Sequence, residues 1–266
     1  MFFRASSVIL LLLSLNLLWG IKPIDYALAL LFAVWTAFSI RGMTSMRSQV
    51  FGRVYWRGPP TLKAVALTFD DGPWEPSTGE VLDVLKFHGV KATFFVIGDN
   101  ARRFPELVKR AFDEGHEFGN HTQSHPWMFR MLFKNIKADI EDCQDEIERL
   151  TGMRPRFFRQ PVGMNNPSVM KVIDAMGMVM VGWQARAYDG VRVDKAAIVR
   201  RILNKTRPGG IILLHDGWDG RSGGDRESTV EALKVIIPAL KERGYEFKKV
   251  SELIGMENRQ PSPPAR

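Results

Sequence analysis

Residues 64–73 read AVALTFDDGP, an apolar run that ends in two adjacent carboxylates and a Gly-Pro turn. The apolar part is typical of a strand that is buried in a parallel sheet. Active sites of α/β folds are built at the carboxyl ends of such strands. Because the chain turns at this point, Asp70 and Asp71 can both reach one cavity. The stretch therefore predicts an α/β fold with a polar site at the end of a central strand.

A second polar group lies at residues 121–126, which read HTQSHP. His121 and His125 are one helical turn apart, so both imidazoles can face the same point. Two histidines and one carboxylate form a three-ligand set with open positions, which is typical of a catalytic metal site. We expect Zn²⁺ there, with Co²⁺ or Fe²⁺ as alternatives that use the same ligands. The second carboxylate is then free to act as a base, and the pattern indicates a hydrolase.

Three further polar residues follow apolar runs, and each has two interpretations. His215 ends the run 210–214 and could protonate a leaving amine or stabilise an oxyanion. Arg159 could hold the base carboxylate in place, and Asp189 could orient the histidine and favour its protonated form. The alternative is that each of these residues is an ordinary strand terminus or forms a surface salt bridge.

Alternating strand and helix patterns organise the rest of the chain. Strands are expected at 65–69, 92–97, 157–159, 179–183, 210–214 and 246–250. Helices are expected at 78–87, 104–114, 134–151, 167–176, 196–205 and 229–243. About six or seven βα units in residues 61–254 fit a closed or nearly closed barrel. Residues 42–60 are expected to be a linker, and residues 255–266 a disordered tail.

The N-terminal residues 1–41 are expected to anchor the protein in a membrane. The stretches Ala5–Ile21 and Ala27–Ile40 carry no charge, and residues 22–25 interrupt them. Each stretch is near the lower limit of length for crossing a bilayer. Residues of the small-x-small type that mark a cleavage site are not evident, so the pattern favours a two-helix hairpin over a removed signal peptide.

The sequence leaves two placements of the catalytic domain open. Arg4 precedes the first stretch, Arg41, Arg47 and Arg53 follow the second, and Lys22 lies between them. The positive-inside rule then places both ends and the domain in the cytoplasm. A single spanning segment would export the domain instead. The net charge of +8 favours an anionic membrane or glycan as partner, and no basic block interleaved with aromatic residues points to nucleic acid.

Together these motifs resemble the polysaccharide deacetylase family, also called the NodB homology domain or carbohydrate esterase family 4, over residues 61–254. The resemblance implies a distorted (β/α)7-type barrel and metal-dependent hydrolysis of the amide bond in N-acetylated amino sugars. It implies that Asp70 is the base and that Asp71, His121 and His125 hold the metal.

The resemblance also assigns the remaining positions. It implies that Arg159 positions the base, that His215 is the acid and that Asp189 tunes it. Pro161, Val162 and Leu213 would line the oxyanion and acetyl site. The chain departs from the family where Val162 replaces an aromatic residue after the proline and where Gly190 replaces a tryptophan after Asp189. Trp74, Trp127, Trp183 or Trp218 could compensate by stacking on sugar.

Three functions follow from this sequence. The first is a membrane-anchored, metal-dependent hydrolase that removes N-acetyl groups from amino-sugar polymers or oligomers of the chitooligosaccharide or peptidoglycan type. The second is a deacylase or deformylase of a lipid-linked sugar precursor. The third is a catalytically silent, glycan-binding membrane protein.

Overall fold

The computed structural model describes residues 22–257, apart from 129–130, 132, 192–193 and 221–225. The expected apolar stretch Ala5–Ile21 and most of the expected tail lie outside these residues. The strands are β1 (Val54–Tyr55), β2 (Ala64–Asp70), β3 (Thr93–Val96), β4 (Glu117–Asn120), β5 (Phe157–Phe158), β6 (Val179–Val181), β7 (Ala185–Arg186), β8 (Gly210–His215) and β9 (Glu246–Phe247).

The helices are α2 (Lys22–Thr44), α3 (Ser77–Phe87), α4 (Gly98–Arg103), α5 (Pro105–Asp113), α6 (Phe133–Thr151), α7 (Pro167–Ala175), α8 (Lys195–Lys205), α9 (Glu227–Glu242) and α10 (Val250–Leu253). A 3-10 turn, η2, covers Pro161–Gly163. All six helices expected from the sequence are present, with α4 and α10 in addition.

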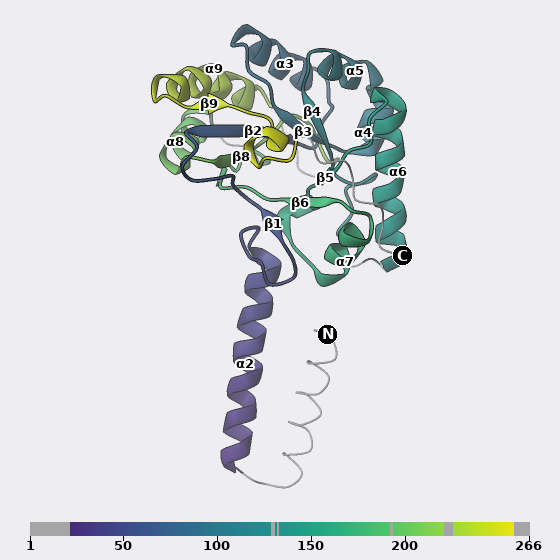
Figure 1. The fold of residues 1–266 in the computed structure, drawn as a ribbon, viewed down its shortest axis with the longest axis vertical. Helices are drawn as coiled ribbons and strands as arrows, with labels where there is room; N and C mark the ends of the chain where they lie inside the picture. Colours follow the sequence, from purple (N-terminus) through teal and green to yellow (C-terminus); the bar gives the residue numbers. More distant parts are fainter. Residues whose placement is uncertain (1–21, 129–130, 132, 192–193, 221–225, 258–266) are drawn as a thin grey trace.

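The strands form one parallel sheet in the order β1-β6-β5-β4-β3-β2-β8-β7, and β9 pairs beside the start of β2. The sheet curls, and the helices lie around its outside (Figure 1). Among the described residues β1 and β7 do not pair with each other, so the curl stays open between them. The result is a curled half-barrel, which confirms the predicted α/β fold with a distorted barrel.

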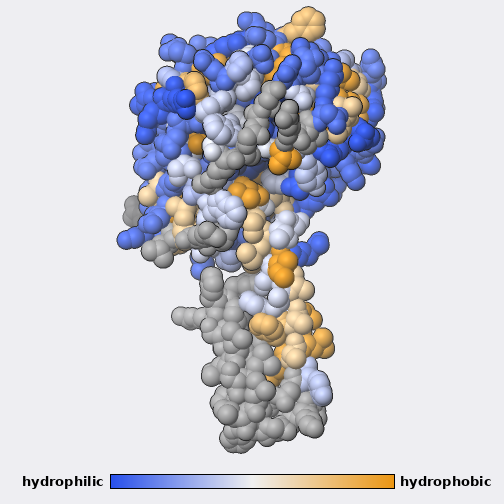
Figure 2. Space-filling model, turned by 180° about the vertical axis from the view of Figure 1, so that it is seen from behind, coloured by the Kyte–Doolittle hydropathy of each residue, from blue (hydrophilic) through white to orange (hydrophobic). Residues whose placement is uncertain are grey.

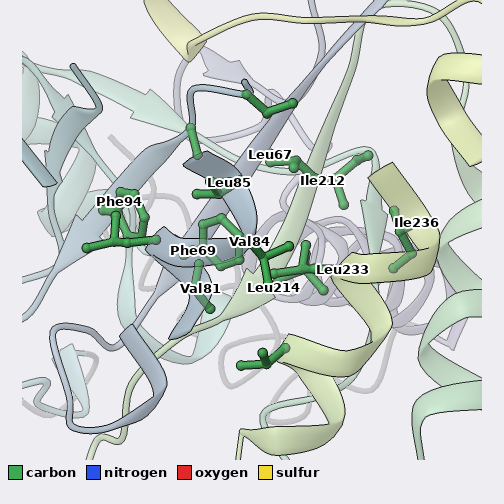
Figure 3. Packing of buried hydrophobic residues seen from close by; sticks show 14 of the residues in the cluster. Leu67, Phe69, Val81, Val84, Leu85, Phe94, Ile212, Leu214, Leu233 and Ile236 are labelled. Atoms are coloured by element: carbon green, nitrogen blue, oxygen red, sulfur yellow. The ribbon is translucent and has the colours of Figure 1, made fainter. Parts of the chain in front are cut away.

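The apolar run of β2 is buried on both faces. Leu67 and Phe69 point to the outside, where they pack with Leu214 of β8 against the helices α3 and α9 (Figure 3). Ala64 and Ala66 point to the inside, where Phe95 fills the interior. Each large side chain buried in this way contributes about 1.5–3 kcal/mol. This two-sided burial explains why the run is apolar at successive positions, and it fixes the strand end at Asp70.

The segment expected to be a linker, 42–60, belongs in part to the folded domain. Its residues Val54–Tyr55 form β1, which pairs with β6. Met46 and Val54 are buried. Gln49 closes the loop between them, since its Oε1 accepts from the Val54 N–H at 2.9 Å and its Nε2 donates to the Val54 carbonyl at 3.0 Å. The linker prediction is wrong for residues 46–55, because the polar side chain of Gln49 hydrogen-bonds to the backbone of this packed loop.

Strands β4 and β7 were not predicted from the sequence. Strand β4 has the sequence EFGN, without an apolar run. Polar residues are tolerated in this strand because they form hydrogen bonds with other segments. The carboxylate of Glu117 accepts from Thr93 Oγ1 at 2.8 Å, and Asn120 donates to the carbonyl of Ile140 at 2.8 Å. Strand β7 has only two residues. The strand expected at 246–250 is shorter, since α10 begins at Val250.

Helix α2 projects from the body of the protein (Figure 1). It begins at Lys22, so residues 22–25, which the sequence suggested as an interruption, form its first turn. Its part Tyr26–Thr44 has 19 residues and a mean hydropathy of 1.5, so it could cross a membrane by length and composition. Most of its large apolar side chains are exposed, and its visible face is mainly orange beneath a mainly blue body (Figure 2). The hairpin itself stays a prediction.

Candidate active site

Strand β2 delivers the two carboxylates to one cavity by an abrupt turn. Asp70 is the last residue of the strand, and Asp71 has φ 72°, in the left-handed region. The Asp71 carbonyl accepts from Asn100 Nδ2 at 2.7 Å, which holds the turn. Both carboxylates are buried. The turn brings neighbouring side chains, which would point oppositely along a strand, to the same side.

The two histidines lie in a loop after β4 and not on a helix, so the helical-turn argument from their spacing is wrong. Thr122 has φ 71° and His125 has φ 50°. The loop is held by Asn120 Oδ1, which accepts from the Thr122 N–H at 2.8 Å, and by Thr122 Oγ1, which accepts from the His125 N–H at 3.1 Å. Left-handed backbone at these positions lets both rings face Asp71.

Asp71, His121 and His125 form a group that fits a metal ion. Asp71 Oδ1 lies 3.4 Å from His121 Nε2 and 3.3 Å from His125 Nε2. Ligand atoms that share a tetrahedral ion at ~2.1 Å lie ~3.4 Å from one another, so these separations match a common ion. All three ligand atoms are within 4.8 Å of one another, and the three residues are buried. Burial alone would raise the pKa of Asp71, but the hydrogen bond to His121 and the nearby histidine charges lower it to about 2.

The Nδ1 atoms of both histidines face oxygen atoms of the kind that orient metal ligands. The carbonyl of Arg159 lies 2.8 Å from His121 Nδ1, and Asp219 Oδ2 lies 3.4 Å from His125 Nδ1. A carbonyl or carboxylate at Nδ1 leaves Nε2 of the ring for the metal. The sequence did not single out Asp219. The only signal was its place in the loop that follows His215.

Arg159 is fully buried and holds Asp70. Its Nη1 donates to Asp70 Oδ1 at 2.7 Å and to Thr68 Oγ1 at 2.8 Å. Its Nε and Nη2 donate to the carbonyls of Val181 and Gly182 at 3.3 and 3.1 Å. Every edge of the guanidinium therefore has an acceptor, which fixes its position. The surface salt bridge that the sequence left as an alternative is excluded by this burial.

His215 is paired with Asp189. Its Nδ1 lies 2.9 Å from Asp189 Oδ1, and its backbone N–H donates to Asp189 Oδ2 at 2.9 Å. Thr229 Oγ1 donates to the same Oδ2 at 2.9 Å. Burial would lower the pKa of His215, but the charge of Asp189 and the hydrogen bond to it raise the pKa to about 9. The ring therefore carries a proton near neutral pH.

These residues meet in one pocket of about 300 Å³. Of the residues predicted for the site, seven line it: Asp70, Asp71, His121, His125, Val162, Leu213 and His215. Arg159, Asp189 and Pro161 are buried behind this wall. Trp183 is the one tryptophan of the four candidates that lines the pocket.

Backbone strain among the described residues gathers at this pocket. Five residues other than glycine have positive φ, and they are Asp71, Thr122, His125, Val162 and Tyr188. Four of the five line the pocket, and Thr122 lies between the two histidines. Val162 at φ 62° is the most unusual because its side chain is β-branched. Such residues cost of order 1–3 kcal/mol and cluster at functional sites.

The two departures from the family pattern both open the pocket. Val162 is 54% exposed and offers a small apolar side chain at the rim. A side chain at Gly190 would begin 3.3 Å from Cε1 and Nε2 of His215, so the glycine leaves that ring uncovered. Tyr188, which the sequence did not single out, lines the pocket beside Trp183 and supplies aromatic surface.

The sequence of the chain is similar to those of known deacetylases. A sequence model described as polysaccharide deacetylase matches residues 57–181. A peptidoglycan-N-acetylglucosamine deacetylase of Bacillus cereus is 39% identical over 205 residues, which cover 76% of this chain and 93% of that protein. A chitooligosaccharide deacetylase of a Bradyrhizobium species is 39% identical over 198 residues, covering 72% of this chain and 90% of that protein.

Solved structures show the same fold. The crystal structure of a peptidoglycan N-acetylglucosamine deacetylase superposes with a TM-score of 0.72 at 36% identity, covering 77% of this chain and 94% of that chain. A pseudoenzyme of carbohydrate esterase family 4 from Bacillus anthracis superposes with a TM-score of 0.68 at 31% identity, covering 74% and 67%. The chain therefore belongs to the polysaccharide deacetylase family, a family of hydrolytic N-deacetylases.

Proposed function

We propose that the protein is a membrane-anchored, metal-dependent enzyme that removes N-acetyl groups from amino-sugar glycans of the peptidoglycan or chitooligosaccharide type. The observation that carries this proposal is the meeting of three groups in one pocket: the Asp71-His121-His125 set, the Arg159-held Asp70 and the Asp189-held His215. The relatives named for peptidoglycan and chitooligosaccharide support the substrate class.

Asp71, His121 and His125 would hold a divalent cation, and the spacing of their ligand atoms supports this assignment. We expect Zn²⁺, with Co²⁺ or Fe²⁺ as alternatives. When bound, such an ion supplies a Lewis acid that polarises the acyl oxygen and lowers the pKa of water.

The other residues of the pocket would move and stabilise charge. Asp70, held in place by Arg159, takes the proton of the attacking water. The backbone N–H of Val162 stabilises the negative charge that develops on the acyl oxygen. His215, protonated through its contact with Asp189, donates its proton to the departing amine. Acetate and a free amino sugar result.

A lipid-linked N-acyl sugar is the second candidate substrate. The observation that favours it is a cationic pocket beside the catalytic one, next to the end of α2. Placement in a membrane rests on the length and hydropathy of Tyr26–Thr44. Reporter fusions at the C-terminus, one active only outside the cytoplasm and one only inside, test which side carries the domain.

The proposed activity is tested by acetate release from the purified full chain, first stripped with a chelator and then supplied with zinc. The substrates are N-acetylated chitooligosaccharides and peptidoglycan. We expect release that is restored by zinc and lost in Asp70→Asn. A zinc-loaded protein that releases no acetate from these glycans or from a lipid-linked N-acyl sugar would support the catalytically silent alternative; one structural relative is described as a pseudoenzyme.

A further inference from the structure

A second pocket of about 330 Å³ adjoins the catalytic one. Its lining includes Thr44, Ser45, Arg47, Arg186 and Lys205. Trp183, Arg186 and Tyr188 line both pockets. The two pockets therefore lie on either side of the same three residues.

The second pocket is cationic. Arg47, Arg186 and Lys205 line it, and no Asp or Glu of the described residues does. Nor does any of the three form an ion pair with a carboxylate within the described part of the chain. Arg186 stacks on Tyr188, with its guanidinium carbon 3.8 Å from the ring centroid. Guanidinium and ammonium groups without carboxylate partners are suited to bind phosphate.

The pocket lies at the end of α2. Thr44 is the last residue of the helix and lines the pocket. The carbonyl of Met43 accepts from the Asn165 N–H at 2.8 Å, and Arg47 donates to the carbonyl of Gln184. These two hydrogen bonds connect the end of the helix to the loop that follows η2 and to the segment that follows Trp183. Val162 of η2 lines the catalytic pocket.

The segment that follows α2 packs closely against Gly182, and this packing requires a glycine at that position. A Cβ there would lie 2.5 Å from the carbonyl oxygen of Met46, which only a glycine avoids. When Tyr26–Thr44 crosses a bilayer, a pocket lined by Thr44 and Ser45 lies at the level of the lipid headgroups. The negative groups at that level are phosphates.

We propose that the pocket formed by Arg47, Arg186 and Lys205 binds the phosphate of a lipid-linked, N-acylated amino sugar, while the acylated sugar occupies the catalytic pocket. This proposal rests on the proposed deacetylase function and names a substrate class for it. The reaction is the same hydrolysis: water adds its hydroxyl to the acyl carbon, the amide C–N bond breaks, and the amine takes the proton. The phosphate and the lipid remain attached to the sugar.

The test measures binding to the full-length Asp70→Asn protein, which cannot turn substrate over, in nanodiscs of phosphatidylcholine. The probes are farnesyl diphospho-N-acetylglucosamine and the neutral methyl glycoside of N-acetylglucosamine. We expect the diphosphate probe to bind about tenfold more tightly or better, as two charge-assisted contacts to phosphate provide. In Lys205→Gln this preference falls to about twofold or less. Arg200→Gln removes an exposed arginine of the same helix α8 and keeps the preference.

Equal affinity for the two probes, or a preference that Lys205→Gln leaves intact, would overturn the proposal; the second result would mean that the diphosphate binds elsewhere, such as at the metal ligands. Farnesyl diphosphate without sugar that binds as tightly as the full probe would also overturn it, in favour of a headgroup site for ordinary lipids. The proposed deacetylase function fails separately, when the wild-type chain releases no acetate from either lipid-linked or polymeric sugars.

Discussion

Arg159 donates from Nη1 to Oδ1 of Asp70 at 2.7 Å, and its guanidinium carbon lies 4.0 Å from the centre of the Phe95 ring. The other carboxylate oxygen, Oδ2, faces His121 Nε2 at 3.9 Å. One oxygen of Asp70 is therefore held by the arginine, and the other is turned toward the Asp71-His121-His125 group. This division suits a base that acts on a water beside the metal ligands.

Replacing Arg159 is expected to cost both stability and activity. Arg159→Met leaves the carboxylate of Asp70 buried without its cation, a change that typically destabilises a protein by about 3–5 kcal/mol. Denaturant unfolding measures this loss. Arg159→Met/Asp70→Asn removes the buried charge as well and should recover part of the stability. An Arg159→Met protein as stable as wild type would show that the pair does not hold the site together.

Asp70 and Asp71 are expected to fail in different ways. Asp71→Asn removes the carboxylate whose Oδ1 lies 3.3 and 3.4 Å from the two histidines, so zinc binding should weaken sharply. Asp70→Asn should keep one zinc per chain and lose turnover. Metal content after gel filtration, measured together with acetate release, separates the two. Full activity of Asp70→Asn would exclude it as the base.

Asp219 is expected to orient His125. Its carboxylate lies 3.4 Å from His125 Nδ1. Loss of such a partner typically lowers metal affinity by about 10–100-fold, and we expect this of Asp219→Asn. Competition with a chromophoric chelator measures the change. Asp174→Asn, an exposed carboxylate on α7, is the control and should bind zinc as wild type does.

The protonation of His215 is expected to depend on Asp189. Because the pKa of His215 is raised to about 9 from 6.5, the contact stabilises the fold fully below pH 6.5, and this contribution is lost as the pH rises through about 9. In the metal-free protein, NMR titration of the His215 ring should show a midpoint near 9. Asp189→Asn should lower this midpoint, because burial of the ring is then opposed only by the charges of Asp71 and Asp70.

His88 serves as an internal reference in the same spectra, because it lies on the far end of α3 and its pKa should not respond to Asp189→Asn. The activity of the zinc-loaded protein should decrease at high pH, where His215 loses its proton. In Asp189→Asn this decrease should begin at a lower pH than in the wild type. An unchanged His215 midpoint in Asp189→Asn would contradict the assigned pair.

The meeting of Asp70 and His215 in one pocket could be predicted from the sequence, because parallel strands deliver their polar ends to one edge of the sheet. Asp70 and His215 end neighbouring strands and are paired in the register of β2 and β8. The backbone conformation that orients the two histidines could not be predicted. Thr122 and His125 have positive φ, which their residue types do not favour. Strand β4 was missed because partners elsewhere in the chain satisfy its polar residues.

The cationic pocket could not be predicted either. It combines residues 44–47, 183–188 and 205, which are far apart in the sequence and share no pattern. The close approach of Met46 to Gly182 brings residues 44–47 to residues 183–188, and Gln184 Nε2 donates to the carbonyl of Lys205 at 2.8 Å. Residues 44–47, which fall in the segment expected to be a linker, line this pocket.

A zinc titration tests whether one metal ion, held by Asp71, His121 and His125, is required for deacetylation. Acetate release from N-acetylated chitooligosaccharides is measured while zinc is added to the chelator-stripped full chain. We expect activity to start near zero, to rise in proportion to added zinc and to level off at one equivalent per chain, with no rise in Asp71→Asn. Activity that is present without metal, or that rises equally in Asp71→Asn, would contradict this requirement.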